Sequence, residues 1–175
     1  KILLKNVNKF TFFFNDIEGI QKRNNFIQVG MPIRKEIEEL YMKKYNLVED
    51  KPINILITGG SLGAEVMALN IAKAISKFPS NLKKKIKILQ QVRNENMDFV
   101  YNLYQESKID FKLEKFIENF AEALEWSHIV ICRCGSGTLS ENLVSGRPSI
   151  LIPLIPSADD HQIKNAKYIE NIGAG

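Results

Sequence analysis

The fold is decided by the stretch INILITGGSLGA at residues 53–64. Its first six residues, rich in isoleucine and leucine, are typical of a buried strand, and the glycines that follow let the backbone turn sharply. From Ala64 to Phe78, apolar residues recur at intervals of three and four, which predicts a helix with one buried side. Strand, glycine turn and helix in direct succession form the repeating unit of parallel α/β folds.

The same succession continues on both sides of this stretch. Short apolar runs that predict strands occupy residues 26–29, 86–89, 111–116, 129–132 and 149–154. Helical stripes lie between them, formed by Ile33, Ile37, Leu40 and Tyr41 and by Met97, Val100, Tyr101 and Tyr104. The strands read apolar throughout, so we expect a Rossmann-like parallel sheet with helices on both faces. Ligands of such sheets bind beyond the carboxyl ends of the strands.

The composition is that of a globular domain. The chain has 175 residues, of which 45% are hydrophobic and 25% charged, and these values exclude a disordered, collagenous or coiled-coil protein. No apolar run reaches the roughly 18 residues that a membrane-spanning helix needs. The net charge of +4 comes mostly from dispersed lysines with one short cluster at residues 83–85. This pattern does not indicate nucleic acid as a partner.

The cysteines and histidines do not form a metal-binding pattern. Cys132 and Cys134 stand one residue apart in an apolar run, and two cysteines cannot supply four zinc ligands or a disulfide framework. We therefore expect reduced thiols packed in the core of a cytosolic protein. Of the two histidines, His128 begins an apolar strand and is expected to be structural, and His161 has no suitably spaced partners. No metal site is expected.

Two breaks divide the chain. Gly30-Met31-Pro32 interrupts it after the first short strand, and a polar stretch at residues 46–52 precedes the main strand. We expect residues 1–30 to be the tail of a preceding domain, 31–52 an interdomain helix and linker, and 53–175 the main domain. The first residue is Lys1 instead of Met, and the last residues follow a helical pattern directly, so we expect a piece of a longer protein.

The loop at residues 59–64 is a candidate anion site. Its glycines let backbone N–H groups at the start of the following helix face an anion, and Ser61 adds a hydroxyl donor. A diphosphate fits such a loop. The spacing is not GxGxxG and the lysine of a P-loop is missing, which disfavours NAD binding and ATP hydrolysis. The alternative is a plain tight turn with Ser61 as helix N-cap.

A second glycine loop, CRCGSGTLSE at residues 132–141, also joins a strand to a helix. Two such loops at one edge of a sheet form a crevice lined by backbone donors. Glu141 has the chemistry to accept two hydrogen bonds from vicinal hydroxyls, such as those of a ribose. The alternative is a capping box, in which Thr138 is the N-cap and Glu141 only closes its own helix.

A third loop leaves the last predicted strand between prolines. It brings Asp159, Asp160, His161 and Gln162 to the start of a helix. Acidic residues favour the helix dipole at that end, and an amide side chain has the donors and acceptor to bind a polar ligand. The three loops together predict a site for a polar, phosphorylated ligand.

Taken in order, these motifs resemble the MurG-type transferases of peptidoglycan synthesis. The resemblance rests on Gly59-Gly60-Ser61-Leu62-Gly63-Ala64 with Asn70, on Phe116-Ile117, on residues 133–141, on Asp159-Asp160-His161-Gln162 with Asn165-Ala166, and on Gly30-Met31-Pro32-Ile33-Arg34. Such enzymes move N-acetylglucosamine from its UDP donor onto undecaprenyl-diphosphate-linked muramoyl-pentapeptide and form lipid II. The resemblance implies the two-domain GT-B architecture, of which this chain is the donor-binding C-terminal half.

The resemblance also implies a substrate-binding set. Arg34 and Ser61 hold the donor diphosphate, the backbone of Ile117 reads uracil, and Glu141 takes the ribose hydroxyls. Thr138 supports the phosphates, and Gln162, with His161 beside it, contacts the sugar. Ser136, Gly137, Leu139 and Ser140 complete the set. No metal or cofactor is implied, and the catalytic base is expected in the N-terminal domain, so no catalytic residue is assigned to this chain.

The sequence departs from the family pattern at three places. Met31 stands where the family has Asn, residues 90–93 read QQVR where it has His-Gln-Thr-Gly, and Ser136-Gly137-Thr138 replaces Ala-Leu-Thr. Two rival functions stay open: a UDP-sugar epimerase on the same GT-B scaffold, and a non-catalytic module that binds nucleotide sugars.

The expected partners are UDP-N-acetylglucosamine and, through the missing domain, the lipid-linked acceptor. The expected location is the cytoplasmic face of the bacterial inner membrane. Residues 1–14 carry lysines at four-residue spacing beside apolar residues, which is compatible with a membrane-binding helix or with a core segment of the missing domain. The resemblance favours the core segment, so membrane attachment is expected mainly through the missing domain.

Overall fold

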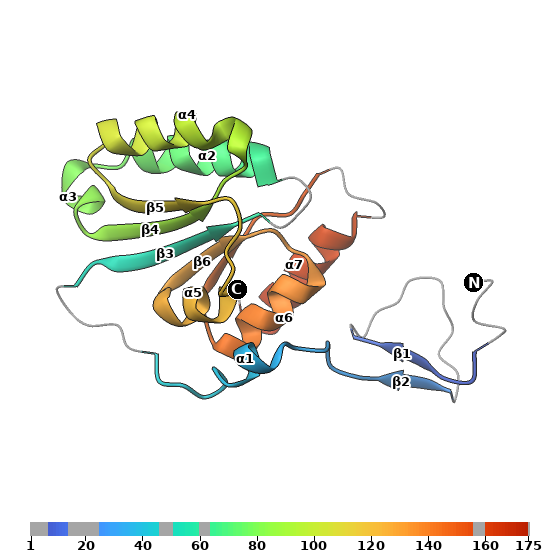
Figure 1. Cartoon of the computed structure of the whole chain (residues 1–175). Helices are drawn as coiled ribbons and strands as arrows, with labels where there is room; N and C mark the ends of the chain where they lie inside the picture. The colour runs from blue at the N-terminus through green and yellow to red at the C-terminus, as the bar shows by residue number, and fades with distance from the viewer. Residues whose placement is uncertain (1–6, 14–24, 46–50, 60–63, 156–159, 175) are drawn as a thin grey trace. The chain divides into compact units, whose positions relative to one another are not determined.

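The computed structural model describes residues 7–13, 25–45, 51–59, 64–155 and 160–174. The chain divides into two units, Lys1–Pro32 and Ile33–Gly175 (Figure 1). In the first unit, strands β1 (Phe10–Phe12) and β2 (Phe26–Gln28) pair in parallel. The rings of Phe10 and Phe26 lie 4.9 Å apart across this pair.

The second unit contains a five-stranded sheet whose paired strands all run parallel. The strand order is β5-β4-β3-β6-β7. In chain order the strands are β3 (Ile53–Thr58), β4 (Ile86–Gln91), β5 (Asp110–Glu114), β6 (Ile129–Cys132) and β7 (Ser149–Leu151). Each lies within a few residues of a predicted strand. The central position belongs to β3 and β6 lies beside it, and these are the two strands followed by glycine loops.

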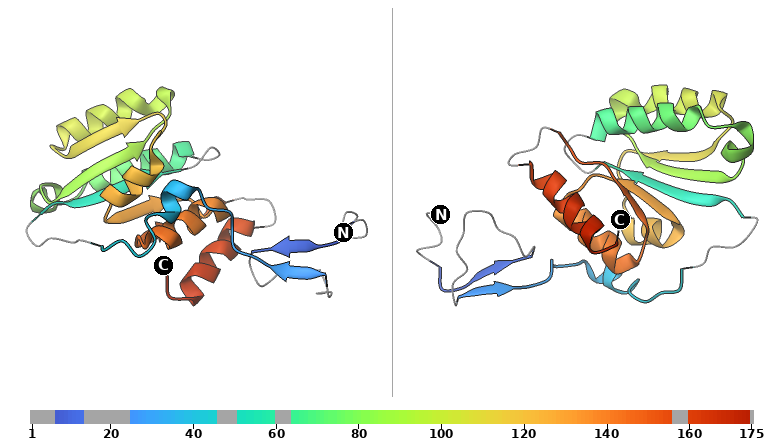
Figure 2. Two further views of the ribbon diagram at one scale, coloured as in Figure 1. Left: turned by 60° about the horizontal axis from the view of Figure 1, so that its bottom comes forward. Right: turned by 180° about the vertical axis from the view of Figure 1, so that it is seen from behind.

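Helices lie on both faces of this sheet. They are α1 (Lys35–Glu38), α2 (Ala64–Ser76), α3 (Ser80–Lys83), α4 (Asn94–Glu106), α5 (Phe120–Trp126), α6 (Ser136–Ser145) and α7 (His161–Asn171). Helices α2 and α4 cover one face, and α5 and α6 lie on the other (Figures 1 and 2). The predicted fold class, a parallel sheet with helices on both faces, is confirmed.

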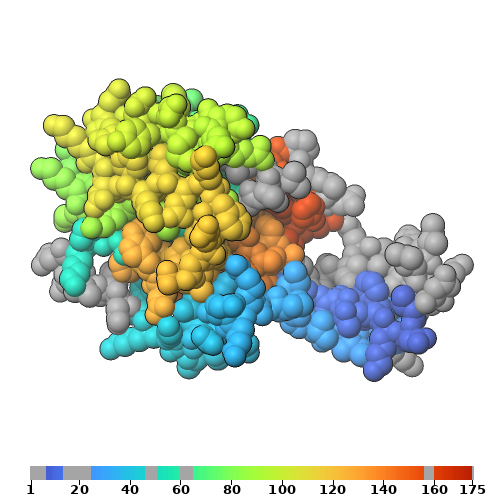
Figure 3. All heavy atoms as spheres, viewed as in Figure 1, coloured from blue at the N-terminus to red at the C-terminus, as the bar shows by residue number. Residues whose placement is uncertain are grey.

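The core divides into layers according to the alternation of side chains along the strands. On one face of the sheet, Ile55 and Ile57 of β3 pack with Val100 and Tyr104 of α4. On the other face, Leu56 of β3 and Val130 of β6 pack with Leu124 of α5 and with Ile37 and Leu40 around α1. The region around α1 therefore belongs to the core of the second unit, and Figure 3 shows it against α5 and α6.

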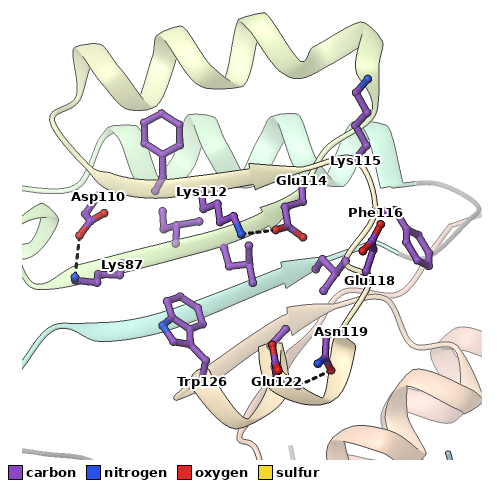
Figure 4. Close-up of a pocket in the computed structure, with 15 residues that line it drawn as sticks. Lys87, Asp110, Lys112, Glu114, Lys115, Phe116, Glu118, Asn119, Glu122 and Trp126 are labelled. Carbon is purple, nitrogen blue, oxygen red and sulfur yellow. Dashed lines mark hydrogen bonds and ion pairs between the residues drawn. The ribbon is translucent and has the colours of Figure 1, made fainter.

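The expectation of strands that are apolar throughout was wrong for β4 and β5. In β4 the exposed Lys87 separates the buried Ile86 and Ile88, and in β5 Asp110 and Lys112 are exposed. The reason is that α5 packs on β3 and β6 and leaves the outer strands open on that face. A groove of about 810 Å³ lies there, lined by side chains of β4, β5 and α5 (Figure 4).

The two cysteines are free and fully buried, as predicted. Burial raises the pKa of Cys132 to about 12 and that of Cys134 to about 11. Since the thiolate is the reactive form, both thiols are expected to resist iodoacetamide at pH 8 while the chain is folded and to react once urea unfolds it. Mass spectrometry of the two samples measures this. Rapid alkylation of the folded chain would contradict the buried arrangement.

Among the described residues, no helix is both long and apolar enough to cross a membrane.

Candidate functional site

The second glycine loop brings a helix N-terminus to the carboxyl end of a central strand. Gly135 is the N-cap of α6, with φ −68° and ψ 138°, and the helix begins at Ser136. The first N–H groups of a helix have no carbonyl partner inside it, and they carry the positive end of the helix dipole. The N–H groups of Ser136, Gly137 and Thr138 therefore form a donor cluster suited to an anion.

The position of this cap excludes the capping box considered for Glu141. A capping box requires Thr138 at the N-cap, but Thr138 is the third residue of α6. Instead, Glu141 Oε1 accepts a hydrogen bond from Arg34 Nε at 2.9 Å, across 107 positions of the sequence. The Cα atom of Glu141 lies about 7.5 Å along the axis of α6 from that of Ser136, at 1.5 Å per residue.

Arg34 comes from the segment that precedes α1. It is the N-cap of that short helix, and its guanidinium carbon lies 5.4 Å from the centre of the Phe120 ring at the start of α5. The Arg34 side chain is 53% exposed, whereas that of Glu141 is 17% exposed. The structure thus brings together a half-exposed arginine and a mostly buried carboxylate, and both residues were predicted to bind the ligand.

Ile117 lies in the loop between β5 and α5. Its side chain is buried in the core cluster with Leu56 and Leu124, and the preceding Phe116 is 70% exposed. Asn119 caps α5, because its Oδ1 accepts a hydrogen bond from Glu122 N at 3.2 Å (Figure 4). The side chain of Ile117 therefore belongs to the core, and the role predicted for this residue concerns its backbone.

Helix α7 fixes the backbone just before the donor cluster. Gln162 Oε1 accepts hydrogen bonds from the backbone N–H groups of Cys134, at 3.2 Å, and Leu154, at 3.0 Å. Asn165 Nδ2 donates to the carbonyl oxygen of Cys134 at 2.9 Å. Both amide side chains are buried. Gln162, predicted to contact sugar, therefore uses its oxygen to hold two loops together.

Arg133 also joins these two loops. Its Nη1 donates to the carbonyl oxygens of Ile152, at 3.2 Å, and Pro153, at 2.9 Å. Sequence reasoning assigned no role to Arg133 and used Asn165 only as part of a motif. The three-residue spacing of Gln162 and Asn165, which places both on one face of α7, was the available signal.

The remaining predicted site residues lie in different surroundings. Leu139 packs in a small core cluster with Cys134 and Ile169, and Ser140 Oγ donates to the Ser136 carbonyl at 2.8 Å within α6. His161 is the exposed first residue of α7. Ser61 and Asp159 lie outside the described residues.

His128 has the structural role that was predicted. Its Nδ1 accepts a hydrogen bond from Asn54 N at 2.8 Å, which links β6 to β3 at the end of the sheet opposite the glycine loops. In the part of the chain that the structure describes, no three His, Cys, Asp or Glu side chains are grouped as a metal site would need.

Taken together, the site has a helix N-terminus and an arginine that are suited to an anion. It also has a carboxylate that is suited to hydroxyl groups.

Comparison with known proteins places this site in a family. The model of the glycosyltransferase family 28 C-terminal domain matches residues 54–175. A UDP-N-acetylglucosamine--N-acetylmuramyl-(pentapeptide) pyrophosphoryl-undecaprenol N-acetylglucosamine transferase of Caulobacter vibrioides is 38% identical over 145 residues, which are 83% of this chain and 40% of that protein. The enzyme of the same name from Paramagnetospirillum magneticum is 32% identical over 176 residues, 99% of this chain and 47% of that protein.

Solved structures agree with these matches. The crystal structure of Acinetobacter baumannii MurG has a TM-score of 0.74 and 26% identity, and the match covers 98% of this chain and 47% of that one. The glycosyltransferase SnogD from Streptomyces nogalater, at 18% identity, TM-score 0.52 and coverage of 85% and 43%, shares the fold alone. The chain spans less than half the length of these relatives. The resemblance to MurG-type transferases and the GT-B C-terminal fold are confirmed, and the chain belongs to the family of the glycosyltransferase family 28 C-terminal domain.

Proposed function

We propose that this chain is the donor-binding half of an inverting hexosyltransferase that uses UDP-N-acetylglucosamine and forms lipid II. The observation that carries the proposal is that α6 combines an N-terminal donor cluster with Glu141, which pairs with Arg34. A nucleoside diphosphate has an anionic part for the donors and ribose hydroxyls for the carboxylate. The names of the relatives from Caulobacter vibrioides and Paramagnetospirillum magneticum support the choice of sugar and acceptor.

In the proposed complex, each part of the donor has its own partners. The diphosphate lies against the N–H groups at the start of α6 and against Arg34, and Ser61 belongs to the same binding set. The ribose hydroxyls donate to Glu141, and the uracil lies against the backbone of Ile117. The sugar extends toward His161 and Gln162. This order follows the sequence resemblance, and the positions of Glu141 and the α6 N-terminus agree with it.

The chemistry assigned to this half of the enzyme is stabilisation of the leaving group. The acceptor hydroxyl oxygen forms a bond to the sugar C1, the bond from C1 to the diphosphate oxygen breaks, and the hydroxyl proton passes to a base outside this chain. Negative charge then develops on the diphosphate. Backbone donors fixed before the reaction and one arginine stabilise that charge without reorganisation.

The domain limits follow from this proposal. Residues 1–30 are the tail of the acceptor domain, 31–52 the interdomain helix and linker, and 53–175 the donor-binding domain. Binding of the lipid-linked acceptor and attachment to the cytoplasmic face of the inner membrane belong mainly to the acceptor domain. The relatives are more than twice as long as the segment they share with the chain, which supports an acceptor domain in addition to this segment.

Isothermal titration calorimetry with UDP, UDP-N-acetylglucosamine and NAD, all with EDTA present, tests the proposal. Both uridine nucleotides are expected to bind without a divalent cation, because backbone donors and Arg34 provide the positive charge at the diphosphate. NAD is expected not to bind, because the glycine spacing of a dinucleotide site is missing. Binding of NAD without binding of UDP would exclude the assignment.

A further inference from the structure

Arg34 and Glu141 are paired with each other in the free protein, although the proposed function gives each a different partner. Arg34 Nε and Glu141 Oε1 are 2.9 Å apart. In the proposed complex, Arg34 binds the diphosphate and Glu141 binds the two ribose hydroxyls. A carboxylate that binds two vicinal hydroxyls uses both of its oxygens. In the proposed complex the hydroxyls occupy both oxygens of Glu141 and Arg34 turns to the diphosphate, so donor binding moves the arginine away from Oε1.

We propose that this ion pair makes the site select an intact nucleoside diphosphate over either of its halves. The inference rests on the proposed function and adds a specificity-determining role to the pair. A nucleoside without phosphate has to displace Arg34 from Glu141, and it has no anionic group to which Arg34 can then bind. An inorganic diphosphate attracts Arg34 and leaves Glu141 with no cation. Only a ligand with both parts provides a new partner for both side chains.

The burial of the two side chains shows which half is disfavoured more. Glu141 is 17% exposed, so a carboxylate left there without a partner has lost most of its water. Arg34 is 53% exposed and lies over the Phe120 ring, so its guanidinium keeps water and an aromatic contact when it leaves Glu141. Diphosphate alone is therefore disfavoured more strongly than the nucleoside alone.

Titration calorimetry with uridine, inorganic pyrophosphate and UDP tests the proposal on the wild-type chain, Arg34→Gln and Glu141→Gln. Arg34→Gln frees the carboxylate, so uridine is expected to bind about two- to fivefold more tightly, the range that a partly exposed ion pair contributes, and pyrophosphate more weakly. Glu141→Gln frees the arginine, so pyrophosphate is expected to bind more tightly by a similar factor and uridine more weakly. UDP is expected to bind more weakly to both variants.

Lys43 and Glu125 provide the matched control. They form a half-exposed ion pair of 2.8 Å that joins the segment after α1 to α5. Lys43→Gln and Glu125→Gln make the same changes of charge and are expected to leave all three affinities unchanged.

Two different failures are distinguishable. If wild type binds UDP but Arg34→Gln fails to tighten uridine, or Glu141→Gln fails to tighten pyrophosphate, the selectivity proposal is wrong. If the wild-type chain binds neither UDP nor its halves, the proposed function itself is wrong.

Discussion

Tyr104→Ala is expected to lower the free energy of unfolding by about 3–5 kcal/mol, the range for removing a buried aromatic ring. Tyr104 is completely buried between α4 and the sheet, and its ring lies 5.3 Å from that of Phe111. Its hydroxyl donates to Gln90 Oε1 at 2.6 Å, and Gln90 Nε2 donates in turn to the Ala68 carbonyl at 3.1 Å. Urea unfolding followed by circular dichroism measures the loss.

Tyr104→Phe separates the hydrogen bond from the ring. It leaves the buried Gln90 oxygen without its donor and is expected to cost about 1–3 kcal/mol. Tyr101→Phe is the matched control on the same helix, because the Tyr101 hydroxyl is exposed and only accepts from Gln105 Nε2, at 3.0 Å. A Tyr104→Phe chain as stable as the Tyr101→Phe control would show that the Tyr104–Gln90 bond contributes nothing.

Burial also raises the pKa of Tyr104 well above its ordinary value. The unfolded chain therefore loses the phenolic proton at a lower pH than the folded chain does. The part of the free energy of unfolding that depends on protonated Tyr104 is fully present below the ordinary tyrosine pKa of about 10. It is lost as the pH rises above that value. Tyr104→Phe is expected to reduce this loss.

Glu141→Gln is expected to weaken UDP binding by about 1–3 kcal/mol, the range for losing a hydrogen bond to a charged group at a mostly enclosed position. The melting temperature is expected to change little, because Glu141 does not close a capping box and its pair with Arg34 is partly exposed, which limits its contribution to about 1 kcal/mol. Calorimetry and thermal unfolding of the same preparation measure both effects.

Glu125→Gln removes an ion pair whose carboxylate is more exposed and serves as the control for the loss of charge. An unchanged UDP affinity in folded Glu141→Gln would show that Glu141 does not bind the ribose.

Most of the main sheet could be predicted from the sequence because its strands are short apolar runs between helical stripes. The central strands β3 and β6 are buried on both faces and therefore have the clearest pattern. Strand β1 was not predicted, because three residues in a phenylalanine-rich segment do not distinguish a strand from a helix. The stripe from Ile33 to Tyr41 predicted a helix longer than the four residues of α1.

The site could be predicted only as a set of loops. Glycine spacing indicated that residues 59–64 and 132–141 lie at the carboxyl edge of the sheet, and a parallel topology predicts that they lie close together. The pairing of Arg34 with Glu141 joins positions 107 residues apart, so no local pattern contains it. The bonds from Gln162 and Asn165 to Cys134 depend in the same way on how α7 packs beside the β6–α6 loop.

The central claim is that UDP binds at the N-terminus of α6 and not in the groove over β4 and β5, although the groove is a large hollow in the described structure. Nuclear magnetic resonance of the ¹⁵N-labelled chain during titration with UDP tests this most directly. The account predicts shifts at the backbone amides of residues 135–138, with the amides of Lys87 and Lys112 and the indole N–H of Trp126 unchanged. Ile117 also lines the groove, so its shift does not distinguish the two sites. Shifts confined to Lys87, Lys112 and Trp126, with residues 135–138 unaffected, would contradict it.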